Sequence, residues 1–267
     1  MDKREQITQN DEYVLSLSYG KDSLACLGAI EKLGLPLNRI VHAEVWATET
    51  IHADFPEMVK FKEKADSIIL KKYGIEVEHF KADITYEEQF YRTRYNKRLQ
   101  KNCIYGFPIM KGDWCKSKLK MAALQKCKTK GVQYIGIAYD EPNRFHVLTE
   151  NKRSPLVEAG WTEEMCRKWC EQNDLLSPIY STSSRGGCWF CHNQGVDQLR
   201  LLRKMHPELW QLLLEWDKDS PTTFKPDGHT VNDYEKRFCL EDEGLIDKNE
   251  PFRWKMLEEP LQTRIFI

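Results

Sequence analysis

An alternation of strand patterns with helix patterns constrains the fold of this chain more than any other feature of its sequence. The strand patterns cover residues 13–18, 40–46, 75–80 and 132–138, and the helix patterns between them cover residues 23–33, 55–73 and 115–127. Strands that alternate with helices form a parallel sheet with helices on both faces, and ligands bind beyond the carboxyl ends of its strands. The sequence therefore predicts an α/β fold with a doubly wound parallel sheet.

The second part of the chain has a different pattern. Helix patterns occupy residues 163–173, 196–204 and 207–216. Neither an internal repeat nor a low-complexity linker separates the two parts. We expect an α/β domain over residues 1–160 and a helical C-terminal region, which carries a C-x-x-C motif, over residues 161–267.

Composition excludes several classes of protein. The 267 residues are 41% hydrophobic and 30% charged, which is the balance of a globular chain and not of a disordered or fibrous one. The first twelve residues carry six charges, and no run of about 18 apolar residues occurs. We expect a cytoplasmic protein without a membrane span, whose nine cysteines stay reduced and serve as ligands, nucleophiles or core residues.

A strongly basic segment lies within a chain whose net charge is only −1. Residues 91–130 contain one acid, Asp113, and twelve basic residues, which are Arg92, Arg94, Lys97, Arg98, Lys101, Lys111, Lys116, Lys118, Lys120, Lys126, Lys128 and Lys130. Basic and aromatic side chains together are typical of nucleic-acid binding, and a solvated helix face is the alternative. We predict that residues 91–130 bind tRNA or DNA. The residues expected on the nucleic-acid backbone are Arg92, Arg94, Lys97 and Arg98.

The turn between the first strand pattern and the first helix pattern is suited to a phosphate. It reads Ser18-Tyr19-Gly20-Lys21-Asp22-Ser23. A glycine lets the backbone approach an anion, hydroxyl and backbone N–H groups donate hydrogen bonds to it, and the start of a helix adds positive potential. The spacing is neither that of a P-loop nor that of a dinucleotide fingerprint. An ordinary helix cap is the alternative to a phosphate site.

Three segments resemble the PP-loop ATP pyrophosphatase superfamily and, within it, the phosphoadenylyl-sulfate (PAPS) reductase-like branch. The Ser-x-Gly-Lys-Asp-Ser turn is similar to the pyrophosphate loop of the superfamily. Residues 136–144 are similar to a loop of the branch, as are residues 154–164 followed by Gly-Cys-x-x-Cys at 187–191. The resemblance covers residues 13–216.

The resemblance implies a PP-loop nucleotide-binding domain that takes ATP, with Mg²⁺, or a related adenine nucleotide. The site residues it implies are Ser18, Gly20, Lys21, Asp22, Ser23, Gly136, Glu141 and Arg144. Among them we expect Lys21, Asp22 and Arg144 to be catalytic, and Lys118 is a further candidate for contact with the phosphates. Arginine binds phosphate oxygens as a fork and lysine binds them as a point charge, which agrees with these roles.

The C-x-x-C-H segment at residues 188–192 admits several chemical interpretations. Haem attachment would require export, and a thioredoxin-type dithiol would open the first helix of a small βαβ fold. Two thiolates can instead hold one side of a zinc ion or of an iron–sulfur cluster. Core cysteines without a metal are a further alternative.

Cys115 supplies a third thiolate, because it lies where iron–sulfur members of the resembled branch carry cluster cysteines. We predict a metal centre on Cys115, Cys188 and Cys191, with a [4Fe–4S] cluster as the expected group and zinc as the alternative. The fourth ligand, which is His192, Cys103 or no residue, stays open. The cysteines expected to lie in the core are Cys26, Cys127, Cys166 and Cys170.

Three functions agree with these features. The first is adenylylation of a tRNA or DNA base by ATP, followed by sulfur transfer from a donor protein. The second is reduction of a sulfonucleotide such as PAPS, although the Glu-Cys-Gly-x-His segment of classical reductases is missing. The third is a non-catalytic nucleotide-binding accessory of a nucleic-acid defence or mobile-element complex. We predict the first, an enzyme of the adenylyltransferase and sulfurtransferase type.

Overall fold

The computed structural model describes residues 12–97, 100–108, 114–127, 131–181, 187–249 and 252–257. Contacts divide the chain into two units, one formed by residues 1–87 and 114–188 and the other by residues 88–113 and 189–267. The predicted division into residues 1–160 and residues 161–267 stays a prediction.

The first unit contains a five-stranded parallel sheet. Its strands are β1 (Glu12–Ser16), β2 (Arg39–Glu44), β3 (Val77–Lys81), β6 (Gly131–Tyr134) and β7 (Lys152–Arg153), in the order β3-β2-β1-β6-β7. Leu15 on the central strand pairs with Ile40 on one side and with Tyr134 on the other. This register brings the carboxyl ends of β1, β2 and β6 to one edge of the sheet.

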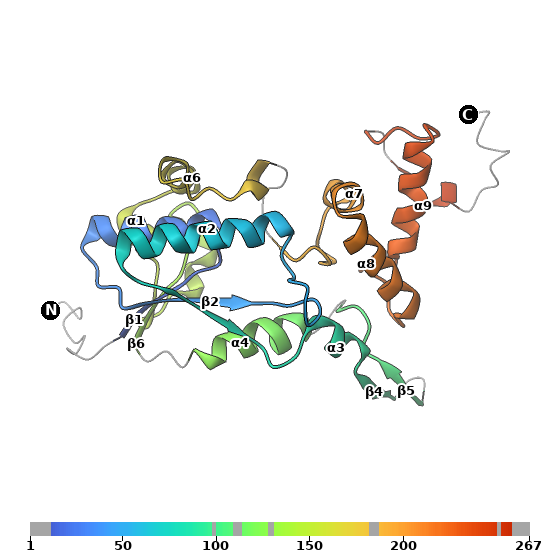
Figure 1. Cartoon of the computed structure of the whole chain (residues 1–267), viewed down its shortest axis with the longest axis horizontal. Helices are drawn as coiled ribbons and strands as arrows, with labels where there is room; N and C mark the ends of the chain where they lie inside the picture. Colours follow the sequence, from blue (N-terminus) through green and yellow to red (C-terminus); the bar gives the residue numbers. More distant parts are fainter. Residues whose placement is uncertain are drawn as a thin grey trace. The chain divides into compact units, whose positions relative to one another are not determined.

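Helices cover both faces of this sheet, so the predicted doubly wound α/β class is confirmed. They are α1 (Lys21–Leu33), α2 (Pro56–Tyr73), α4 (Met121–Lys126), α5 (Pro155–Ala159) and α6 (Glu163–Gln172). Leu15 packs in the core with residues of α1 and α2, whereas its neighbour Val14 packs with Val41 and Cys127 on the opposite face. Figure 1 shows α1 and α2 on one side of the strands and α4 on the other.

Shorter helical segments complete the first unit. They are the π-helical turn η1 (Lys116–Lys120) and the 3₁₀ turns η2 (Pro142–Val147) and η3 (Pro178–Ser181). The helix predicted over residues 115–127 is therefore an interrupted one, because the N–H of Met121 bonds the carbonyl of Lys116, five residues back, before α4 begins. Such single π-helical turns are frequent at functional sites.

The second unit is mainly helical and has an aromatic core. Its elements are β4 (Thr93–Asn96), β5 (Lys101–Ile104), α7 (Val196–Met205), α8 (Pro207–Asp219), α9 (Val231–Asp242) and η4 (Trp254–Leu257), and α3 (Tyr86–Tyr91) crosses the boundary between the units. The rings of Trp189 and Trp216 stack with centroids 5.4 Å apart, and both side chains are fully buried. Among the described residues, no helix is long and apolar enough to span a bilayer.

Candidate functional site

The turn between β1 and α1 is closed by hydrogen bonds around the hydroxyl of Ser23. This hydroxyl accepts hydrogen bonds from the backbone N–H of Ser18 at 3.1 Å and from the Ser18 hydroxyl at 3.0 Å, and it donates one to the carbonyl oxygen of Gly20 at 2.9 Å. The structure therefore brings Ser18, Gly20 and Ser23 into one ordered loop between a strand and a helix. Loops of this geometry present backbone N–H groups to anions.

Gly136 lies directly against this turn. A Cβ atom at Gly136 would lie 2.6 Å from the backbone nitrogen of Ser23 and 2.8 Å from the carbonyl carbon of Asp22. Only glycine fits so close to another backbone without moving it. The loops that follow β1 and β6 therefore meet at the carboxyl edge of the sheet.

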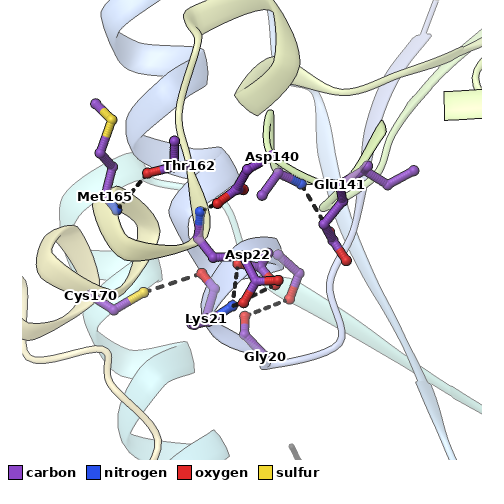
Figure 2. Close-up of polar contacts among 12 residues, drawn as sticks. Gly20, Lys21, Asp22, Asp140, Glu141, Thr162, Met165 and Cys170 are labelled. Atoms are coloured by element: carbon purple, nitrogen blue, oxygen red, sulfur yellow. Dashed lines mark hydrogen bonds and ion pairs between the residues drawn. The ribbon is translucent and has the colours of Figure 1, made fainter. Parts of the chain in front are cut away.

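The ammonium of Lys21 lies between two carboxylates. Its Nζ atom is 2.9 Å from Oδ1 of Asp22, as Figure 2 shows, and 2.7 Å from Oε2 of Glu163, the first residue of α6. Burial lowers the pKa of Lys21, but the hydrogen bonds that its ammonium donates to Glu163 and Asp22 outweigh this effect and hold the pKa above its ordinary value. Burial also raises the pKa of Asp22, against the opposing effect of Lys21. An anion that binds at the start of α1 would therefore lie beside a lysine that is already paired with two carboxylates.

Helix α6 and the loop after β6 are fixed against the same turn. Asp140 accepts a hydrogen bond from the backbone N–H of Glu163 at 2.9 Å, and the Cys170 thiol donates one to the carbonyl of Lys21 at 3.3 Å (Figure 2). The Tyr180 hydroxyl accepts the backbone N–H of Lys21 at 3.0 Å. Tyr180 thus accepts the hydrogen bond of the first backbone N–H in α1. No sequence motif had indicated that Tyr180 belongs to this site.

Glu141 and Arg144 form a pair on η2 and the residue before it. Nη1 of Arg144 is 2.8 Å from both carboxylate oxygens of Glu141, which also accepts the backbone N–H of Ala138 at 3.1 Å. The Arg144 side chain is exposed, and neither residue lines the cavity described next. The structure therefore shows Arg144 exposed and paired with Glu141, and its predicted contact with the nucleotide stays a prediction.

A cavity of about 350 Å³ opens beside the turn, within the first unit. Its polar lining residues are Ser16, Ser18, Tyr19, Gly20, His42, Asp54, Lys62, Lys120, Tyr180, Gly187 and Cys188, and its apolar ones are Leu17, Ala43, Val45, Ala53, Met58, Leu124 and Ile179. Lys120, the last residue of η1, lines the cavity, whereas the predicted Lys118 is exposed on the same turn. The volume is in the range of sites for small ligands.

Lys62 is a buried cation in the wall of this cavity. Its Nζ atom is 2.5 Å from Oδ2 of Asp54 and 2.9 Å from Nε2 of His42, and only 7% of the residue is exposed. Burial and the charge of Lys62 lower the pKa of His42 to about 3, so this imidazole is neutral. Nδ1 of His42 lies 2.8 Å from the carbonyl of Leu17 and therefore carries the proton. Nε2 is left to accept a hydrogen bond from Lys62.

Tyr19 connects the turn to this buried cluster. It has a left-handed backbone conformation, with φ of 56°, which is unusual for a residue other than glycine and common at functional sites. Its ring lies 5.2 Å from the Lys62 ammonium and 4.7 Å from the His42 ring. Its hydroxyl donates a hydrogen bond to Asp66. Burial and this bond raise the pKa of Tyr19 above its ordinary value.

The predicted metal ligands are divided between the units. Cys115 and Cys188 belong to the first unit and Cys191 to the second. In the part of the chain that the structure describes, no group of three or more His, Cys, Asp or Glu side chains is arranged to hold a metal ion. The centre on these three cysteines stays a prediction. The predicted core cysteines Cys26, Cys127, Cys166 and Cys170 are all buried.

The basic segment is also divided between the units. Arg92, Arg94 and Lys97 are exposed on and beside β4 in the second unit, and Lys116, Lys118 and Lys120 are exposed on η1 in the first. The guanidinium of Arg94 lies 4.7 Å above the ring of Tyr105. Four of the twelve residues, Arg98, Lys111, Lys128 and Lys130, are outside the described ranges. Nucleic-acid binding by this segment stays a prediction.

Comparisons with known proteins include a structural likeness. No protein-family model matches the chain, and no curated protein matches its sequence. Among solved structures, the chain is similar to the U34-tRNA thiolase NcsA from Methanococcus maripaludis with its [4Fe-4S] cluster, at 14% identity and a TM-score of 0.36, over 85% of this chain and 81% of that one. The resemblance to PP-loop proteins stands on the sequence motifs and on the sheet and turn described above.

Proposed function

We propose that this chain is a PP-loop enzyme that binds ATP at the turn before α1 and uses it to activate a base of tRNA or DNA for sulfur transfer. The observation that carries the proposal is the cavity, because Ser18 and Gly20 of the turn, Lys120 and Cys188 line one volume. Phosphate-binding groups and a sulfur atom are therefore within reach of one ligand.

In the proposed reaction, a carbonyl oxygen of the base attacks the α-phosphorus of ATP, and the bond between this phosphorus and pyrophosphate breaks. The N–H groups at the start of α1, other than the one that Tyr180 accepts, and the ammonium of Lys21 stabilise the charge that develops on the departing pyrophosphate. Asp22 holds Lys21 in place through its hydrogen bond. For Arg144 to bind the phosphates, its ion pair with Glu141 would have to break.

The second proposed step replaces the activated oxygen with sulfur. A hydrosulfide ion released by a donor protein adds to the base carbon, the bond from that carbon to the oxygen of AMP breaks, and the sulfur loses its proton, so that the thiolated base and AMP are the products. We propose that Cys188 either lies beside this sulfur as it attacks or binds the predicted cluster. Since the described residues contain no complete set of metal ligands, we assign no step to a metal ion or cluster.

Turnover of α-labelled ATP by anaerobically purified protein, with and without tRNA, tests the proposal. We expect AMP that depends on RNA, and iron and acid-labile sulfide in the same preparation. Asp22→Asn should lower AMP formation by about 100-fold or more, because it removes the acid that orients Lys21. Glu31→Gln, in the last turn of the same helix, is the control and should leave the rate unchanged.

Two results would replace this proposal with one of its alternatives. Thiol-dependent release of sulfite from PAPS would identify a sulfonucleotide reductase. Tight ATP binding with no AMP formed in the presence of tRNA or DNA would favour the non-catalytic accessory.

A further inference from the structure

We propose that Asp54 and Lys62 form a subsite for the ribose hydroxyls of the bound nucleotide and thereby make the cavity selective for ribonucleotides over deoxyribonucleotides. This inference rests on the proposed function, because it requires the phosphates of a nucleotide at the turn before α1. Neither residue belongs to the turn or to a motif noted in the sequence.

The first evidence for this subsite is that both side chains have hydrogen-bonding capacity left for a ligand. Lys62 donates to Oδ2 of Asp54 at 2.5 Å and to Nε2 of His42 at 2.9 Å, and an ammonium has three N–H groups. Among the described residues, neither its third N–H nor Oδ1 of Asp54 has a hydrogen-bond partner. The pair therefore offers one donor and one acceptor to the cavity it lines. A hydroxyl group, which both accepts and donates, matches this combination.

The charge of the cluster favours an uncharged ligand group. Asp54 neutralises Lys62, and the neighbouring His42 is neutral. A second phosphate at this position would find no unbalanced positive charge, whereas a sugar hydroxyl needs none. Lys62 is also held rigidly, because it is buried and its ammonium lies 5.2 Å from the ring of Tyr19. A rigid donor and acceptor discriminate well, since a ligand that lacks the hydroxyl leaves both of them unmatched.

The position of Asp54 and Lys62 in the cavity favours contact with the sugar of the nucleotide over contact with its base. Tyr19 lies between Ser18 and Gly20 in the turn and contacts Lys62 through its ring, so the pair is next to the predicted phosphate positions. In a nucleotide the group bonded directly to the phosphates is the ribose. The apolar residues Val45, Met58 and Ile179 offer a surface for the base in the same cavity.

Titration calorimetry of the full chain with ATP, 2′-deoxy-ATP and 3′-deoxy-ATP tests the inference without any substitution. A hydrogen bond to a charged group corresponds to roughly a 10- to 100-fold change in affinity. We expect at least one deoxy analogue to bind about 10-fold or more weakly than ATP. Equal affinities for all three nucleotides would overturn the ribose subsite while leaving the nucleotide site intact. Failure to bind any of them would overturn the proposed function and the inference together.

A double variant assigns the selectivity to this pair. Asp54→Leu combined with Lys62→Met removes both charges and both hydrogen-bonding groups at once, so that neither charge is left buried and unpaired. We expect its affinities for ATP and for the deoxy analogues to become equal within about threefold. The matched control is Lys64→Met on the same helix, because Lys64 pairs with Asp174 at the surface. Selectivity that persists unchanged in the double variant would contradict the assignment.

Discussion

The ammonium nitrogen of Lys21, the first residue of α1, lies 2.7 Å from the carboxylate of Glu163, the first residue of α6. The cation that the sequence assigns to a phosphate is thus held by an acid from a distant segment of the chain. A helix N-terminus attracts anions, and here a carboxylate of the protein lies beside the place that a ligand anion would take. Nucleotide binding must then act against the charge of Glu163.

Glu163→Gln should therefore strengthen ATP binding. The substitution removes a negative charge beside the phosphate site and frees one contact of Lys21. Because Glu163 is about half exposed, we expect only a two- to fivefold lower Kd for ATP, measured by calorimetry at low ionic strength. Glu164→Gln is the control, since Glu164 pairs with Lys168 on the outer side of α6. Weaker binding by the Glu163 variant would show that its carboxylate supports the ligand.

Gly136→Ala should damage the turn before α1 without disturbing the rest of the protein. Its new Cβ atom would press on the backbone of Asp22 and Ser23, which must move. We expect a loss of about 1–3 kcal/mol in the free energy of unfolding, measured with urea, and weaker ATP binding. Gly195→Ala is the comparison, because a Cβ atom there has its nearest neighbour 4.0 Å away. Unchanged stability and ATP affinity in Gly136→Ala would mean that the two loops do not meet as described.

His79 should make stability depend on pH. Its hydrogen bonds to Asp66 at 3.0 Å and to Glu44 at 2.7 Å raise the pKa of His79 to about 9. A raised pKa stabilises the folded protein fully below the unfolded value of about 6.5, and this stabilisation is lost as the pH rises through 9. Relative to His79→Gln, the wild type should lose up to about 3 kcal/mol between pH 6.5 and 9.5.

Urea unfolding of the wild type and of His79→Gln at several pH values checks this expectation. Taking the difference between the two proteins removes the titration of cysteines and other groups that both share. A difference that stays constant over this range would mean that His79 is not held in its charged form by Asp66 and Glu44.

The basic segment should give nucleic-acid binding a steep dependence on salt. Each phosphate that a lysine or arginine neutralises releases counterions, so the logarithm of the binding constant falls linearly with the logarithm of salt concentration. Changing Arg92, Arg94, Lys97 and Arg98 together to Ala should flatten this slope for tRNA and spare ATP affinity. The control changes the exposed lysines Lys60, Lys64 and Lys71 of α2. If the wild type does not bind tRNA even at low salt, the basic segment is a solvated surface and not a nucleic-acid site.

The sequence predicted the sheet because local patterns and chain order decide it. Residues 13–18 and 132–138 alternate or are continuously apolar, and they form β1 and β6 side by side. The turn at Ser18–Ser23 could be located for the same reason, since it must follow the first strand. The short pair β4 and β5 was missed, because two strands of four residues in a basic segment have little hydrophobic pattern.

The buried half of the cavity could not be predicted in this way. In sequence, Lys62 looks like an ordinary charge on an amphipathic helix. Only the parallel register of β1 with β2, in which Ser16 pairs with Val41, brings His42 beside the turn and Lys62 beside His42. One sequence signal for these cavity residues was available, because the side chains that follow parallel strands lie together at the carboxyl edge of the sheet. Applied to the residues after β2, this rule would have indicated Val45 and Asp54.

Binding of nucleotide phosphates by the turn before α1 is tested by titration calorimetry of ATP with the wild type, with Asp22→Ala and with the Glu31→Gln control. We expect saturable binding to the wild type and to the control, and at least about 10-fold weaker binding to Asp22→Ala, with circular dichroism showing that all three proteins fold alike. Equal affinity of ATP for the wild type and for Asp22→Ala would contradict the assignment of this turn.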